Sequence, residues 1–118
     1  MLQVRRGDIF NVNFGTRAGH EQEGLRPAIV VQSDFHCDLA TLWVIPTSTR
    51  AHPDVDYHVP VTIQGQRALA LIEQLTMIQR PRIKPENYLG HLTTEEMEEI
   101  SDMMRIFGGL DPHYGLRF

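Results

Sequence analysis

Hydrophobic and polar residues alternate near the start of the chain, as they do in a β-strand. Phe10, Val12 and Phe14 are separated by asparagines, and this period of two predicts a strand with one buried face. Segments 28–31 and 39–46 are instead almost continuously apolar and rich in β-branched residues. Such runs are typical of central strands that are buried on both faces.

Three more short apolar segments follow in the second half of the chain. They predict strands at 57–63, 68–72 and 75–78, with a turn at 64–66 between the first two. A proline-bounded segment, PRIKPENYLG at 81–90, closes the predicted sheet region.

One helix is predicted near the end of the chain. Thr93 or Thr94 can serve as its N-cap, and Glu96 completes a capping box with Thr93. Apolar residues then recur at steps of three and four, the spacing of a stripe that packs on a sheet. The stripe consists of Met97, Ile100, Met104 and Phe107. Gly108 and Gly109 are expected to end the helix, so the pattern predicts a mainly β fold with a C-terminal helix, in the α+β class.

The length of 118 residues predicts one domain, spanning 1–118, and a hydrophobic content of 42% is enough for one core. No apolar run approaches the roughly 18 residues that cross a bilayer, and no export signal is visible, so no membrane partner is expected. Cys37 is the only cysteine, which excludes an intrachain disulfide and a cysteine-based zinc site. A single cysteine agrees with a reducing compartment, and we expect a cytoplasmic location.

The formal net charge of −4 argues against a protein that coats nucleic acid through many phosphate contacts. The acids are concentrated at the end of the chain, because residues 86–118 hold seven acidic and two basic residues. Ten of the eleven basic residues are arginines, whose planar guanidinium suits phosphate recognition. A local basic groove is therefore compatible with the sequence.

The segment GTRAGHEQEGLRP between the first two predicted strands is unusually rich in polar groups. His20, Glu21, Gln22 and Arg26 bring together groups that transfer protons or bind anions. Pro27 restricts Arg26 to an extended conformation where the next strand begins. A solvated charged loop is the alternative interpretation.

Two other polar positions stand out. Thr47, Ser48 and Thr49 follow an apolar strand, where their hydroxyls either satisfy the backbone of a turn or donate to a phosphate. Glu73 interrupts an apolar strand, and such a carboxylate is costly unless it is paired or belongs to a site. An arginine partner would explain it.

The standard nucleotide-binding, hydrolase and metalloprotease motifs are absent. In HPDVDYH at 52–58, two histidines alternate with two aspartates, which fits either a metal site or a polar loop leading into an edge strand. His36, Cys37 and Asp38 resemble part of a thiol site, but adjacent side chains in a strand or turn point apart. We predict no metal and no cofactor.

Four segments together carry a family resemblance. RRGDIF at 5–10, AGHEQEGLRPAIVV at 18–31, VIPTS at 44–48 and ALIEQLTMIQRPRI at 70–83 resemble the MazF/PemK toxins of bacterial toxin–antitoxin modules in order and spacing. The resemblance covers roughly positions 5 to 110. It implies an SH3-like barrel of the MazF/CcdB/Kid type that forms a homodimer. It also implies an endoribonuclease, or mRNA interferase, that cuts single-stranded RNA at short sequences.

The same resemblance implies roles for individual residues. Arg26 matches the active-site arginine, Thr47 the active-site threonine, and His20 the loop histidine of the Kid branch. Glu73 stands where that branch has an aspartate, whereas Leu71 stands where Kid has a catalytic arginine. This departure favours the active-site arrangement of the MazF branch, in which Arg26 and Thr47 are the main residues. Substrate contacts are expected from Glu21, Gln22, Ser48, Arg50, Gln74 and Arg80.

Cleavage of this kind needs no metal. The 2′-hydroxyl attacks the adjacent phosphorus and leaves a 2′,3′-cyclic phosphate and a 5′-hydroxyl. Arg26 can stabilise the developing charge, Thr47 can orient a phosphate oxygen, and Glu73 or His20 can move protons. The residue that takes the first proton is left open between them, because arginine is a poor base.

The resemblance implies one protein partner, a cognate antitoxin with an acidic disordered segment. The rival hypothesis is a non-enzymatic toxin like the CcdB gyrase poisons, which leaves the cluster of Arg26, Thr47 and His20 unexplained. A DNA-binding regulator is disfavoured, because the sequence has no helix-turn-helix pattern or basic stripe. The tail 111–118 has no functional interpretation.

Overall fold

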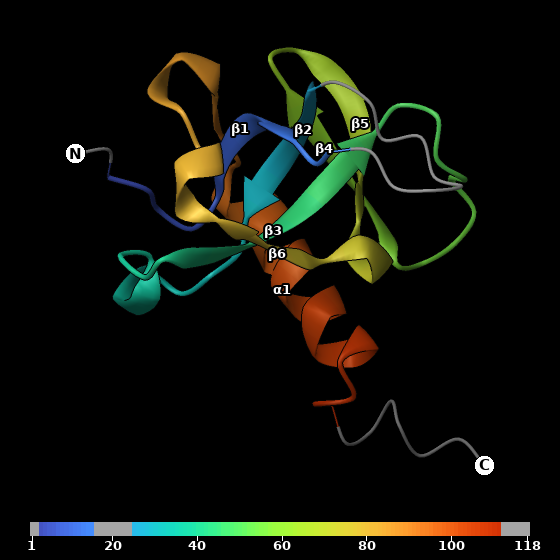
Figure 1. The fold of residues 1–118 in the computed structure, drawn as a ribbon. Helices are drawn as coiled ribbons and strands as arrows, with labels where there is room; N and C mark the ends of the chain where they lie inside the picture. Colours follow the sequence, from blue (N-terminus) through green and yellow to red (C-terminus); the bar gives the residue numbers. More distant parts are fainter. Residues whose placement is uncertain (1–2, 16–24, 112–118) are drawn as a thin grey trace.

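The structure is a computed structural model that describes residues 3–15 and 25–111. Seven strands, four short 3-10 helices and one α-helix follow one another in it (Figure 1). The strands are β1 (Asp8–Asn13), β2 (Leu25–Val30), β3 (Thr41–Ser48), β4 (His58–Ile63), β5 (Gln66–Leu71), β6 (Thr76–Gln79) and β7 (Tyr88–His91). The helices are η1 (Asp34–His36), η2 (Ile72–Gln74), η3 (Arg80–Arg82), η4 (Pro85–Asn87) and α1 (Thr94–Phe107).

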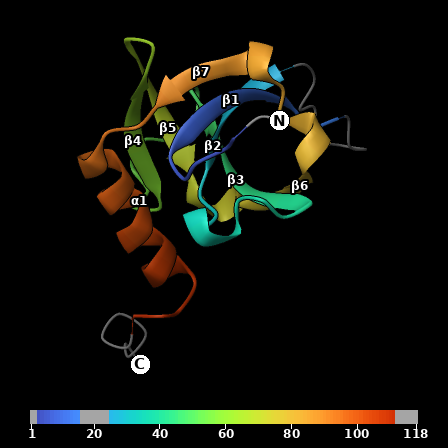
Figure 2. The same cartoon turned by 90° about the vertical axis from the view of Figure 1, so that its left-hand side faces the viewer.

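All strand pairings are antiparallel, and β3 lies at the centre of the sheet. The order is β4-β5-β3-β2-β1-β7, and β6 pairs with the first half of β3 while β5 pairs with its end. The sheet curls into a half-barrel, and α1 lies beside β4 (Figure 2). The predicted mainly β fold with a C-terminal helix is confirmed. Within the described residues, no helix is long and apolar enough to cross a membrane.

Two hydrophobic cores lie on opposite faces of the sheet. Ile9, Ile29 and Ile45 belong to the core that contains Ile100 of α1, whereas their sequence neighbours belong to the second core. Those neighbours include Phe10, Val30 and Val44. Because successive side chains of a strand point to opposite faces, central strands between two cores are apolar throughout, which the prediction matches at 28–31 and 44–46. Within the predicted segment 39–46, Leu39 and Ala40 precede β3 and are exposed, and Trp43 is 48% exposed. The alternation predicted for the first strand is present, because Phe10 and Val12 are buried and Asn11 and Asn13 are more exposed, whereas Ile9 before it is buried in the other core.

The helix begins and ends where the sequence predicts. Thr93 is the N-cap, and the capping box with Glu96 is complete. Gly109 adopts a positive φ of 75° after the last turn, a conformation that favours glycine. Phe107 is half exposed and contacts the ring of Tyr57, with 5.5 Å between the ring centroids.

The outermost strand β4 is tied to its surroundings through its backbone. Glu96 of α1 accepts a hydrogen bond from the Thr62 N–H at 2.7 Å. The His58 N–H donates to the Val55 carbonyl at 3.3 Å, and Pro60 between them has no N–H. Glu96 therefore caps α1 and holds its first turn against β4.

The sheet differs from the prediction at β7, at the end of β3 and at the start of β2, which begins at Leu25 and not at 28. β7 was not predicted, and it pairs with β1 beside the buried carboxylate of Asp8, which contacts Nδ1 of His91 at 2.8 Å. β3 continues two residues further than predicted, so Thr47 and Ser48 lie within the strand and not after it. This places their side chains on the sheet beside β5.

Candidate active site

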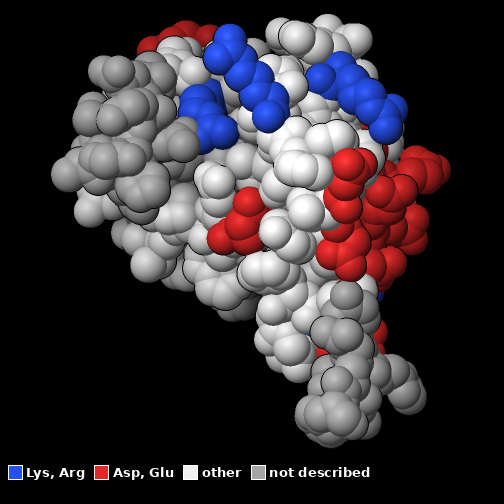
Figure 3. Space-filling view, turned by 90° about the vertical axis from the view of Figure 1, so that its right-hand side faces the viewer, with Lys and Arg blue, Asp and Glu red and all other residues white. Residues whose placement is uncertain are grey.

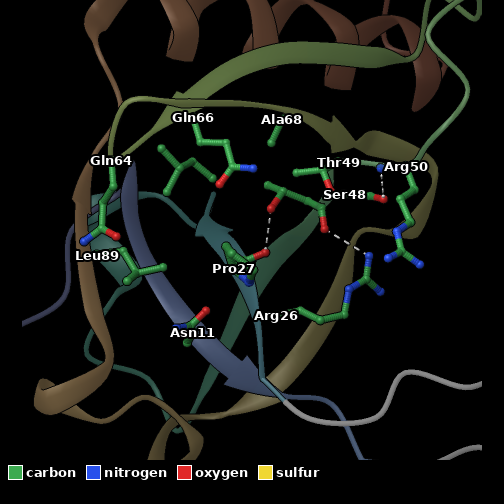
Figure 4. Close-up of a pocket in the computed structure, with 12 residues that line it drawn as sticks. Asn11, Arg26, Pro27, Ser48, Thr49, Arg50, Gln64, Gln66, Ala68 and Leu89 are labelled. Atoms are coloured by element: carbon green, nitrogen blue, oxygen red, sulfur yellow. Dashed lines mark hydrogen bonds between the residues drawn. The ribbon is translucent and has the colours of Figure 1, made fainter.

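A cavity of about 400 Å³ opens between β1, β2, the end of β3 and the β4–β5 hairpin (Figure 4). Its volume lies in the range of about 300–1,000 Å³ that is common for small-molecule sites. The residues that line it are Asn11, Arg26, Pro27, Thr47, Ser48, Thr49, Arg50, Ile63, Gln64, Gln66, Ala68 and Leu89. The structure therefore brings four predicted site residues together: Arg26, Thr47, Ser48 and Arg50.

Arg26 is the second residue of β2 and is partly buried. Its Nη2 donates to the Thr47 carbonyl at 3.0 Å, across the gap between β2 and β3. Burial lowers the pKa of Arg26, but a guanidinium keeps its charge at neutral pH. Within the described residues it has no carboxylate partner. A partly buried cation without a counterion attracts an anion into the cavity.

Thr47 holds the two strands together at this point. It is only 3% exposed, and its Oγ1 donates to the Pro27 carbonyl at 3.0 Å. Because this bond uses the hydroxyl proton, Thr47 does not donate to a phosphate in this arrangement. Its backbone carbonyl accepts the hydrogen bond from Arg26, so Thr47 can position Arg26 in this arrangement.

The next three residues contribute groups that can bind an anion. The Arg50 N–H donates to Ser48 Oγ at 3.0 Å, which leaves the Ser48 hydroxyl proton free to donate. Thr49 adds a second hydroxyl at the cavity. The guanidinium groups of Arg50 and Arg26 lie on the same side in Figure 4. We call Arg26, Ser48, Thr49 and Arg50 the anion end of the cavity.

The other end of the cavity was not predicted. It carries the amides of Asn11, Gln64 and Gln66 together with aliphatic groups of Ile63, Ala68 and Leu89. We call these six residues the amide end. The sequence had indicated only a turn at 64–66, and the alternation of Gln66 and Ala68 on one face of β5 is the signal that could have found it.

Glu73 lies elsewhere. It belongs to η2 and not to a strand, and it does not line the cavity. Its carboxylate contacts His58 Nε2 at 2.9 Å, so the expectation of an arginine partner is wrong. The neighbouring Gln74 is exposed and also lies outside the cavity lining. The structure therefore does not bring Glu73 or Gln74 to Arg26.

His58 carries a built hydrogen-bond network. Its side chain is 8% exposed, its Nδ1 donates to the His52 carbonyl at 2.7 Å, and its Nε2 faces Glu73. Burial acts to lower the pKa of His58, but the hydrogen bonds to Glu73 and His52 and the charge of Glu73 raise it above its ordinary value. Both ring nitrogens face acceptors, which favours the charged imidazolium.

Arg80 and Cys37 are occupied at another part of the fold. The Arg80 guanidinium donates to the Cys37 carbonyl, and Arg80 does not line the cavity. The structure therefore does not bring Arg80 to the site where a substrate contact was expected. Burial is the main cause that raises the pKa of the Cys37 thiol, and Sγ donates to the Gln32 carbonyl at 3.5 Å. A buried, protonated thiol is a poor nucleophile.

The alternating histidines and aspartates at 52–58 do not converge. His52 Nδ1 accepts the Asp54 N–H at 3.2 Å, whereas His58 turns to Glu73. No group of three His, Cys, Asp or Glu side chains in the described part of the chain could hold a metal ion. The polar-loop interpretation of this segment fits its contacts.

Three predicted residues, His20, Glu21 and Gln22, lie outside the described residues. The tail from 112 to 118 lies outside them as well. The predictions for these positions therefore stay predictions.

A second hollow lies between α1, the start of β3 and η2. Its volume is about 570 Å³, and it is lined by Trp43, Leu75, Met104, Phe107 and Leu110, among others. Large apolar side chains are exposed here, with Trp43 at 48% and Leu110 at 75%. Met77, which pairs with Trp43 across β3 and β6, is 60% exposed. We call the hollow lined by Trp43, Leu75, Met104, Phe107 and Leu110 the apolar groove.

Charge is unevenly distributed over the surface. On the face shown in Figure 3, Lys and Arg side chains gather in the upper part, most Asp and Glu side chains lie below them, and a further acidic area lies at the upper edge. Four acidic residues of α1 are all exposed: Glu95, Glu98, Glu99 and Asp102.

Comparisons with known proteins agree on one family. The family model described as "PemK-like, MazF-like toxin of type II toxin-antitoxin system" matches residues 5–107. The chain is similar to "Endoribonuclease EndoA" of Bacillus subtilis (strain 168), with 25% identity over 109 residues, which cover 87% of this chain and 92% of the relative.

Solved structures share the fold. A crystal structure of MazF (Form-I) from Deinococcus radiodurans has a TM-score of 0.75 at 21% identity, covering 92% of this chain and 99% of that chain. An endoribonuclease in complex with its cognate antitoxin, from Mycobacterial species, has a TM-score of 0.76 at 16% identity, covering 91% and 96%.

Proposed function

Because the chain belongs to the PemK-like, MazF-like toxins of type II toxin-antitoxin systems, we propose that it is an endoribonuclease that cuts single-stranded RNA at short sequences. The observation that carries this proposal is the partly buried Arg26, which faces the cavity beside two hydroxyls and has no carboxylate partner among the described residues. Phosphate is the anion that an RNA substrate brings to such a site. The name of the Bacillus subtilis relative supports the same activity.

The anion end supplies the electrostatic part of the reaction. Arg26 and Arg50 neutralise the charge that develops on the phosphorane, and the Ser48 hydroxyl donates to a phosphate oxygen. Thr47 fixes Arg26 by accepting its hydrogen bond and by joining β3 to β2. The positive charge comes from arginine, so the mechanism requires no metal ion.

The covalent step is transesterification. The 2′-oxygen forms a bond to phosphorus, the bond from phosphorus to the 5′-oxygen breaks, and the products are a 2′,3′-cyclic phosphate and a 5′-hydroxyl. One proton must leave the 2′-hydroxyl and one must reach the 5′-oxygen. No Asp, Glu or His among the described residues lines the cavity, so we assign proton transfer to His20 and not to Glu73.

We also propose that the protein acts as a homodimer. The apolar groove supports this, because monomeric proteins rarely leave contiguous apolar side chains of this size exposed. Trp43, Phe107 and Leu110 come from β3, the end of α1 and the residue after it, and they share one surface. Light scattering at micromolar concentration is expected to give the mass of two chains. Trp43→Glu is expected to shift the mass toward one chain.

A toxin that cuts RNA must be held inactive in its own cell, and we propose that the protein is located in the cytoplasm. We propose an antitoxin whose acidic, disordered segment folds onto the cavity and replaces the RNA phosphates. Arg26 and Arg50, which line the cavity, support a negatively charged partner. Because surface ion pairs are screened over about 8 Å at physiological ionic strength, binding should weaken as salt rises. Uncleavable RNA should be unable to bind the toxin–antitoxin complex.

The decisive test is cleavage of a single-stranded RNA and of the same RNA in a duplex, both with excess EDTA. We expect cleavage of the single strand alone, because only unpaired bases can be read. Products should carry a 2′,3′-cyclic phosphate, which blocks end labelling until it is removed. Full loss of activity with EDTA would contradict the metal-independent mechanism. A protein that inhibits DNA gyrase and leaves RNA intact would support the CcdB-like alternative.

A further inference from the structure

The cavity is chemically polarised from one end to the other. In Figure 4 the guanidinium and hydroxyl groups of the anion end lie on the right, and Asn11, Gln64 and Leu89 lie on the left. Gln66 and Ala68 come from the strand that crosses between them. A nucleotide has the same polarity, with a phosphate at one end and a base at the other.

The amides at the left end are not used by the fold. Asn11, Gln64 and Gln66 make no side-chain hydrogen bond with any described residue, although each amide offers donors and an acceptor. Gln32, a buried residue in the bend after β2, shows the contrast, because its amide nitrogen donates to the His36 and Thr41 carbonyls and its oxygen accepts the Trp43 N–H. The buried amide of Gln32 is fully used by the fold, whereas the amides of Gln64 and Gln66 are exposed at the cavity, where a ligand can reach them.

The backbone at Gln64 adds an independent observation. Gln64 and Gly65 both have positive φ, at 51° and 81°, in the two-residue turn between β4 and β5. Such turns favour Asn or Gly at the first position, because a longer L-residue is strained there. The chain keeps glutamine in a strained position, and that glutamine lines the cavity.

We propose that Gln64, Gln66 and Asn11 read the base of the nucleotide next to the scissile phosphate, an inference that rests on the proposed RNA cleavage at the anion end. The amides hydrogen-bond the edge of the base, and Ile63, Ala68 and Leu89 pack against its face. Gln66 and Ala68 both face the cavity from β5, and the small side chain of Ala68 leaves room for the base.

This arrangement predicts selectivity at that position. Stacking on aromatic rings tolerates every base, but hydrogen bonds to a base edge distinguish one base from another. Within the described residues, no aromatic side chain lines the cavity. The base is therefore held by hydrogen bonds and aliphatic contacts.

The test is the cleavage pattern on a single-stranded RNA pool with randomised positions, mapped by sequencing the new 5′ ends. Gln66→Ala and Gln64→Gly are compared with the wild-type protein and with Gln79→Ala, an exposed glutamine of β6 outside the cavity. Gln64→Gly removes the amide and suits the positive φ, so its melting temperature should equal or exceed that of the wild type. Loss of selectivity in this variant cannot then come from unfolding.

We expect both cavity variants to lose preference at one position of the cut site, with the rate at the preferred sequence reduced about tenfold or more. Gln79→Ala should keep the wild-type pattern. If the wild type cuts at preferred sequences and both cavity variants keep every preference, base reading by these amides is wrong while the proposed function stands. If the wild type cuts no RNA, the proposed function fails first.

Discussion

Two partly buried cations of the same sheet have opposite fates. His58 donates to the His52 carbonyl and contacts the Glu73 carboxylate, so its charge is balanced inside the protein. Arg26 donates to one carbonyl oxygen and has no carboxylate partner in the described part of the chain. Both side chains lose hydration when they are partly buried, but only His58 regains that free energy through a carboxylate partner within the protein.

The difference separates a stabilising charge from a functional one. A buried charge without a partner costs free energy, and a protein that keeps such a charge is prepared to bind an opposite charge. The sequence interpretation had placed Glu73 and Arg26 in one site. The structure pairs Glu73 with His58, which leaves Arg26 without a carboxylate partner among the described residues and available for the proposed substrate.

The strongest test of this comparison is Arg26→Ala. We expect cleavage to fall by about a hundredfold or more, which is typical of losing one electrostatic stabiliser, while the melting temperature changes little. Arg67→Ala, an exposed arginine of β5 outside the cavity, should cleave like the wild type. Equal activity of the Arg26 variant in a steady-state assay would remove Arg26 from the site.

The second test concerns the support beneath Arg26. Thr47→Val leaves the Pro27 carbonyl without its donor, and a buried unsatisfied group costs about 1–3 kcal/mol of unfolding free energy. Thr47→Ser keeps the hydroxyl and should recover most of that loss. Urea denaturation of the three proteins measures this. If the valine variant is as stable as the serine variant, the hydroxyl does not join the two strands as described.

A smaller effect is expected for Arg50. If Arg50 contacts one phosphate, Arg50→Ala should reduce the slope of log affinity against log salt by about 0.7 for single-stranded RNA. Binding of an uncleavable RNA across a salt series measures the slope. Arg82→Ala provides the control, because Arg82 donates to the Asn13 carbonyl outside the cavity lining. An unchanged slope for Arg50→Ala would exclude that phosphate contact.

The smallest effect is expected at the balanced cation. The pKa of His58 is raised in the folded state, so the stabilisation from Glu73 is fully present below the ordinary value of 6.5 and disappears as pH rises through the raised pKa. Glu73→Gln should therefore lower stability by about 0.2–1 kcal/mol near pH 6 and by less at alkaline pH. RNA cleavage by this variant should stay close to wild type. A large loss of cleavage would return Glu73 to the active site.

Features set by neighbouring residues could be predicted from the sequence. Thr93 and Glu96 are three residues apart, and their capping box is recognisable because both partners lie in one turn. The apolar runs of β2 and β3 likewise indicate burial on both faces without any knowledge of the pairing. Short β7 was missed, because it holds four residues and depends on pairing with β1.

Features set by distant residues could not be predicted from pattern alone. Thr47 and Arg26 were each identified by family resemblance, but the hydrogen bond between them joins residues 21 positions apart. His58 was missed as the partner of Glu73, because a 15-residue separation carries no local signal. The amide end was missed because Asn11 and Gln64 meet only when β1 and the β4–β5 hairpin fold over the same cavity.

The outer edge of β4 has a consequence for self-association. An exposed edge strand offers its outward N–H groups to any other extended chain, which is a common route to aggregation. At three positions of β4 no outward N–H is free: the His58 N–H donates to the Val55 carbonyl, Pro60 has no N–H, and the Thr62 N–H donates to the Glu96 carboxylate. An incoming strand therefore finds no free N–H donor at these three positions. Replacing Glu96 would therefore do more than loosen a helix cap, because it would also free the Thr62 N–H to pair with another extended chain.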